Sequence, residues 1–236
     1  MVDLIIILIL LFGGFIGYKQ GFTKSLVNFI GIILILIISF ILKNQIAEFM
    51  MLNLPFFDFG GLIKGVSVLN ILFYEVIAFG ICFSILFLIL KIVMVFTNVF
   101  EKILSMTFVL GFLDSVLGFI FGILKNYIIV FVILFVLSLP NFSFNKIISD
   151  SKLREIIIEN TPILSGCVAD ANDVFEEFLS LKEKYENDSV SDKFNYETLD
   201  LFLKYEIVKP KTVEKLISSG KLHIDDSNNL IEKYEK

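Results

Sequence analysis

Apolar residues in the first 140 positions of the chain come in long runs with few charges, rather than in the alternation of a half-buried strand. A run of roughly 20 apolar residues is what an α-helix needs to cross the hydrocarbon core of a bilayer. Later residues are polar, with apolar positions at helical spacing, which is typical of short amphipathic helices. The pattern predicts four membrane-spanning helices, at about residues 4–18, 24–42, 66–90 and 108–139, followed by shorter helices.

This change of pattern divides the chain into a transmembrane domain at residues 1–145 and a polar helical tail at residues 146–236. In the tail, Pro210 and Gly220 are expected to mark helix ends, because they bracket an apolar pattern of helical period. So short a tail buries little surface by itself, and its intrinsic stability is expected to be marginal. The predicted fold class is all-α: an integral membrane bundle of four transmembrane helices with a small helical, acidic soluble tail.

Composition and charge support this division. Hydrophobic residues make up 56% of the chain and charged residues only 19%, which excludes an ordinary soluble domain. Residues 1–150 carry 8 Lys and Arg against 7 Asp and Glu, whereas the remaining residues carry 12 against 18. An acidic tail disfavours a nucleic-acid partner, since phosphate binding needs clustered Lys and Arg.

Two stretches allow a second interpretation. The first apolar run could be a signal peptide, but it lacks a basic start and a cleavage site, and a second span follows at once. A helical hairpin with a short basic turn is therefore favoured. Residues 43–64 mix phenylalanines with proline and glycine. They are interpreted as an interfacial segment, with a short re-entrant loop as the alternative.

Glycines recur at spacings of three and four residues in the first and fourth runs. Such a stripe lets helix backbones approach closely in lipid, where packing drives association. The alternative is that glycine is simply frequent in membrane helices. The predicted helix-packing positions are Gly13, Gly17, Gly21, Gly111, Gly118 and Gly122.

Three ionisable residues lie inside apolar runs: Glu75, Asp114 and Lys125. Each costs roughly 2.5–3.5 kcal/mol at membrane depth and normally faces a partner or water. Asp114 lies about 16 Å along a continuous helix from Lys125, so Glu75 is the better partner for Lys125. The three residues form a candidate polar site for an ion, a proton or a peptide. The favoured alternative is that Lys125 reaches a lipid headgroup or only supports packing, and a helix broken at Lys125 is also left open.

No catalytic, cofactor-binding or metal-binding residues are predicted. His223 is the single histidine, in a polar part of the tail and outside any recognisable triad. No phosphate-binding loop, zinc-type cysteine pair or nucleophile elbow occurs in the sequence. We therefore expect a protein that is not an enzyme and needs no cofactor.

Two short motifs carry a resemblance to a known family. Asp3 precedes an apolar run that ends in the turn Lys19-Gln20-Gly21-Phe22, and Val116-Leu117-Gly118 is followed by Gly122 and Lys125. In this order and spacing, about residues 1–165 resemble the colicin V production protein family. The chain departs from the family pattern at Gln20, which separates the basic residue from the glycine, and at Asn126, where the family has glycine.

The resemblance implies a multi-pass protein of the bacterial cytoplasmic membrane, tied to production or export of a peptide toxin and to envelope homeostasis, with no established enzymatic activity. Its expected partners are the lipid bilayer and an unknown protein that binds the tail, with homo-oligomerisation left open. The alternatives are an oligomeric ion or solute channel or transporter lined by Glu75 and Lys125, and a scaffold whose membrane part is only an anchor. Lys19 and Lys24 in a first loop without acids favour both termini outside, as does analogy with related modules fused to protease domains outside the membrane.

Overall fold

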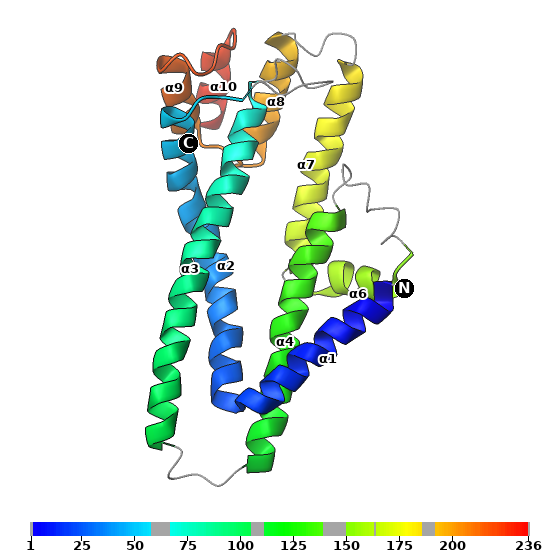
Figure 1. The fold of residues 1–236 in the computed structure, drawn as a ribbon. Helices are drawn as coiled ribbons and strands as arrows, with labels where there is room; N and C mark the ends of the chain where they lie inside the picture. Colours follow the sequence, from blue (N-terminus) through cyan, green and yellow to red (C-terminus); the bar gives the residue numbers. More distant parts are fainter. Residues whose placement is uncertain are drawn as a thin grey trace. The chain divides into compact units, whose positions relative to one another are not determined.

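The computed structural model of the protein describes residues 2–57, 67–104, 111–138, 150–162, 164–185 and 192–235 (Figure 1). These residues contain α-helices and no strand, which confirms the all-α fold class. The helices are α1 (Val2–Gln20), α2 (Phe22–Asn53), α3 (Leu69–Leu104), α4 (Gly111–Ser138), α6 (Lys152–Asn160), α7 (Leu164–Lys184), α8 (Asp192–Lys204), α9 (Pro210–Ser218) and α10 (Ser227–Tyr234).

Among these helices, α1 to α4 are long and apolar enough to cross a membrane. α2 and α3 continue well past the predicted ends at residues 42 and 90, because charges such as Lys43 mark the end of an apolar run and not the end of a helix. Residues 43–53, predicted to begin an interfacial segment, are therefore helical. α4 is continuous through Lys125, so the helix is not broken there. Residues 58–66, 108–110 and 139, which the predictions also covered, lie outside the described residues.

The chain divides into two compact units. The first contains Met1–Ile37 and Ser84–Asn172, and the second contains Ile38–Phe83 and Asp173–Lys236. The predicted boundary between residues 145 and 146 falls in 139–149, outside the described residues. The predicted division into a membrane domain and a tail stays a prediction.

In the first unit, α1 crosses α4 along much of its length (Figure 1). The turn before α2 is a single residue, Gly21, whose φ of +79° is a conformation that glycine adopts without strain. The short helix α6 packs on α1 and α4, and Asp3 accepts hydrogen bonds from the Ser151 hydroxyl and the Leu153 amide at its start. The buried apolar residues of the cluster formed by α1, α4 and α6 are Ile6, Val130, Phe131, Leu134, Ile157 and Ile158.

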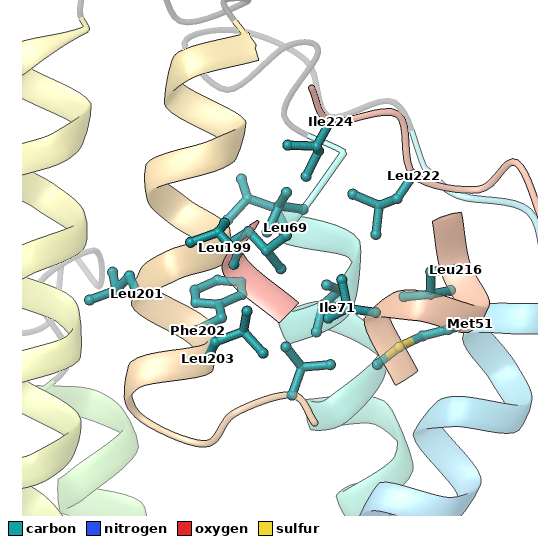
Figure 2. Close-up of a cluster of buried hydrophobic side chains, with 14 of the residues drawn as sticks. Met51, Leu69, Ile71, Leu199, Leu201, Phe202, Leu203, Leu216, Leu222 and Ile224 are labelled. Atoms are coloured by element: carbon teal, nitrogen blue, oxygen red, sulfur yellow. The ribbon is translucent and has the colours of Figure 1, made fainter. Parts of the chain in front are cut away.

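In the second unit, one hydrophobic core joins the end of α2 and the start of α3 to the C-terminal helices α8, α9 and α10. Figure 2 shows Met51 of α2 and Ile71 of α3 around the same core as Phe202 of α8 and Leu216 of α9. The apolar faces of the tail helices therefore pack against the chain's own membrane helices. The core supplies the burial that the tail sequence lacks alone.

The tail helices begin and end where proline and glycine predict. α9 starts at Pro210, where a missing N–H costs nothing. Gly220 lies one residue past the C-cap Ser219 with a φ of +70°, and its amide donates to the Ile217 carbonyl at 3.0 Å. This is the left-handed helix end that glycine favours.

Candidate functional site

Glu75 is paired with a lysine on the neighbouring helix. The Lys43 ammonium of α2 lies 2.5 Å from the Glu75 carboxylate of α3, and the two side chains are 14% and 8% exposed. Lys43 also donates to the side-chain oxygen of Asn44 at 2.8 Å and lies over the Phe40 ring. A buried charge needs both a partner and hydrogen bonds, and Lys43 has both. The sequence analysis missed this pair because it placed Lys43 outside the second helix.

A cleft opens beside this ion pair, within the same unit. Two carboxylates line the cleft, Glu75 and Glu48. Glu48 accepts hydrogen bonds from the Thr212 hydroxyl at 2.8 Å and the Lys215 ammonium at 2.5 Å, both on α9. Glu48 thus connects α9 to α2, a contact between distant parts of the sequence. The cleft is lined by Asn44, Gln45, Glu48, Glu75, Ile207, Val208, Lys209 and Thr212.

The side chain of Asp114, a residue of α4, lies beside the first residue of α2 and caps that helix. The Phe22 amide donates to the Asp114 carboxylate at 3.0 Å. A carboxylate at a helix N-terminus satisfies an orphan donor and is favoured by the helix dipole. An added Cβ on Gly21 would also meet this carboxylate, so the turn and Asp114 fit one another. Asp114 is therefore engaged with the hairpin, and it does not meet Lys125 on the same continuous helix.

The crossing of α1 and α4 is built on glycine. A Cβ added to Gly17 would lie within 3.0 Å of backbone atoms of Gly118 and Gly122, and one added to Gly122 would meet the backbone of Gly13. Backbones this close leave no room for any other residue. Gly111 differs, because no heavy atom among the described residues lies within 4 Å of its Cβ position.

Asn126 and Lys125 are neighbours on α4 with different environments. The Asn126 side-chain amide, 8% exposed, donates to the Ile9 carbonyl of α1 at 2.7 Å. The sequence analysis noted Asn126 only as a departure from a glycine and missed this interhelical bond. Lys125 is half-buried and has no hydrogen-bond or ion-pair partner among the described residues.

Three Lys-Tyr dipeptides at helix ends donate hydrogen bonds to carboxylates on neighbouring tail helices. Lys204 and Tyr205 both donate to Glu177, and these hydrogen bonds lower the pKa of that carboxyl. Lys233 and Tyr234 both donate to Asp200, and the Asp200 bond raises the pKa of Lys233 to about 12. The third dipeptide, Lys184-Tyr185, binds Glu197 in the same way.

Within the described residues, no group of three His, Cys, Asp or Glu side chains is placed to bind a metal ion. His223 is exposed on the loop between α9 and α10. The prediction that the chain has no catalytic, cofactor or metal site stays a prediction.

The four long apolar helices and the C-terminal helices define a multi-pass integral membrane protein with a helical C-terminal part. A family model described as colicin V production protein matches residues 2–162, and the chain belongs to this family. The family is not known as an enzyme family. None of the curated proteins and none of the solved structures compared with the chain matches it.

Proposed function

We propose that this protein is a non-enzymatic component of the bacterial cytoplasmic membrane that supports production or export of a peptide toxin, and envelope homeostasis more broadly. Family membership over residues 2–162 supports the link to a toxin. The observation that carries the proposal is the core shared by α2, α3 and the C-terminal helices. Through that core, a protein bound to the tail can act on membrane helices without any chemistry at a catalytic centre.

The partner would contact the polar outer surface of the tail, since its apolar residues are already buried in the core. Leu216 of α9 is fully buried, whereas Lys211, Glu214 and Ser218 of the same helix are exposed. Exposed charges on a fixed helix suit a surface that gains specificity from electrostatic complementarity. We place this surface, with both termini, outside the cytoplasmic membrane.

The test is complementation in a bacterium that secretes a peptide toxin and lacks its own member of the family. The full chain should restore secreted toxin. Leu216→Asp buries a charge in the shared core and should abolish restoration, whereas Ser218→Asp, exposed on the same helix, should not. Membrane levels of each variant are measured by immunoblot, so that loss of protein is separated from loss of function.

Two results would contradict the proposal. One is toxin secretion that does not depend on the chain in this strain. The other is ion or solute flux through the purified protein in proteoliposomes that disappears with Glu75→Gln or Lys125→Met, because that outcome identifies a channel or transporter instead.

A further inference from the structure

Lys125 lies level with the middle of α1. Going along α4, Gly118 is beside Gly17, Gly122 is beside Gly13, and Asn126 is bonded to Ile9. The two helices are therefore antiparallel, with matching steps of four residues. Since α1 runs from Val2 to Gln20, a residue beside Ile9 and Gly13 is near its centre, and so near mid-depth of the membrane.

The depth of Lys125 separates its ammonium from both membrane surfaces. Gly111 and Ser138, the ends of α4, are 14 and 13 residues away. At 1.5 Å per residue, this is about 20 Å in either direction along the axis. The four-carbon stem of lysine covers only a part of that distance, so a contact with a lipid headgroup is disfavoured. A cation left at this depth costs roughly 2.5–3.5 kcal/mol.

The carboxylates of the four spans have other partners. Asp3 accepts hydrogen bonds at the start of α6, Asp114 caps α2, and Glu48 and Glu75 bind Lys215 and Lys43. The candidate membrane spans are Val2–Gln20, Phe22–Asn53, Leu69–Val95 and Gly111–Phe135, and no described carboxylate within them is left for Lys125. Glu101 of α3 lies beyond the end of the third span. A second copy of this chain would bring the same engaged carboxylates.

We propose that Lys125 is the docking point for a transmembrane helix of a different protein that carries a carboxylate at mid-membrane depth. Charge complementarity selects this occupant, because a desolvated cation gains most from an opposite charge in the same low-dielectric layer. Leu117 and Ile129, eight residues before and four after Lys125, are exposed apolar positions on the same side of α4. They provide the apolar contact on which the partner helix packs. This inference goes beyond the proposed function, which places a partner on the tail.

The test uses a defined probe, a synthetic Leu-rich transmembrane peptide with one central glutamate. The full chain with Cys82→Ala is labelled at Cys167 and reconstituted into vesicles of zwitterionic lipid, and energy transfer to the labelled peptide is measured. The variants are Lys125→Met and Lys125→Arg. The matched control is Lys91→Met on α3, where the ammonium lies over the Phe87 ring of its own helix. A peptide with leucine in place of glutamate reports non-specific association.

We expect the glutamate peptide to bind the wild-type, Lys125→Arg and Lys91→Met proteins with similar affinity. Its affinity for Lys125→Met should be about tenfold lower, which corresponds to about 1.4 kcal/mol of binding free energy. Lys125→Met should fold normally, since it removes an unpaired cation, and circular dichroism verifies this. Equal binding to Lys125→Met, or equal binding of the leucine peptide, would overturn the inference. So would retention of anionic lipid through Lys125, seen by native mass spectrometry, without peptide binding.

Discussion

The Lys43 ammonium and the Glu75 carboxylate, 2.5 Å apart, connect α2 to α3 inside the second unit. The two helices share a hydrophobic core with the C-terminal helices. Ala47, one turn after Lys43, and Tyr74, the residue before Glu75, belong to this core. An ion pair in such a place fixes which faces of the two helices meet, because any other register leaves two charges desolvated.

Removing one partner of this ion pair should cost more than removing both. Lys43→Met leaves the Glu75 carboxylate buried without a cation, and Glu75→Leu leaves the ammonium. We expect each single variant to lower the free energy of unfolding by about 3–5 kcal/mol. The double variant should be close to wild type. Denaturant unfolding in detergent, analysed as a double-mutant cycle, measures this coupling. Additive effects of the two substitutions would mean that the charges act independently.

Alanine should not be tolerated at the glycine crossing of α1 and α4. Gly17→Ala or Gly118→Ala places a Cβ against backbone that cannot turn aside. The expected loss of stability is about 1–3 kcal/mol, typical of overpacking. Gly111→Ala is the matched control, because no heavy atom among the described residues lies within 4 Å of its Cβ position. Thermal unfolding of the purified variants in detergent compares them, and equal stability of Gly17→Ala and Gly111→Ala would contradict the close approach.

The pairing of α7 with α8 should weaken in acid through Glu177. Hydrogen bonds from Lys204, and then from Tyr205, hold the pKa of this carboxyl below its usual value of 4.5. As the pH falls below 4.5, the unfolded state takes up the proton first, so the stability that the ionised carboxylate provides is lost. The effect should be below about 1 kcal/mol, since the Glu177 side chain is 44% exposed and its charge is screened.

Hydrogen exchange in α7 and α8, expressed as protection factors between pH 7 and pH 3, reports this loss. Glu177→Gln should have lower protection at pH 7 and a smaller change with pH than the wild type. Glu176→Gln, exposed one position earlier, serves as the control and should behave like the wild type. The same pH dependence in Glu177→Gln would assign the effect to other groups.

The orientation of the chain predicts which side of the membrane Cys167 faces. Cys82 is buried and is replaced by alanine, so that Cys167 in α7 is the only remaining thiol. With both termini outside, a membrane-impermeant maleimide should label Cys167 in cells whose cytoplasmic membrane is intact. Lysed cells control for access to the thiol. Labelling only after lysis would reverse the orientation and place the tail partner in the cytosol.

The elements of the fold follow from local sequence patterns. Long apolar runs predicted α1 to α4, and Pro210 and Gly220 predicted the limits of α9, because span length and backbone dihedral preferences depend on neighbouring residues. The helices α2 and α3 continue ten or more residues past the ends that were predicted for the membrane spans. Beyond residue 42, α2 packs through Ala47 and Met51 against side chains of the C-terminal helices, and this packing is a tertiary property.

The properties of the candidate site residues likewise divide into those that the sequence predicted and those that only the folded structure determined. The sequence alone determined that the chain is a membrane protein of four apolar helices, that it belongs with the colicin V production family, and that Glu75, Asp114 and Lys125 are costly in apolar runs. Only the tertiary structure decided their partners: Lys43 for Glu75, the start of α2 for Asp114, and none among the described residues for Lys125. The free-energy cost of placing a charge at membrane depth depends on the apolar segment that contains it. The interactions that offset this cost depend on residues that folding brings within a few ångströms.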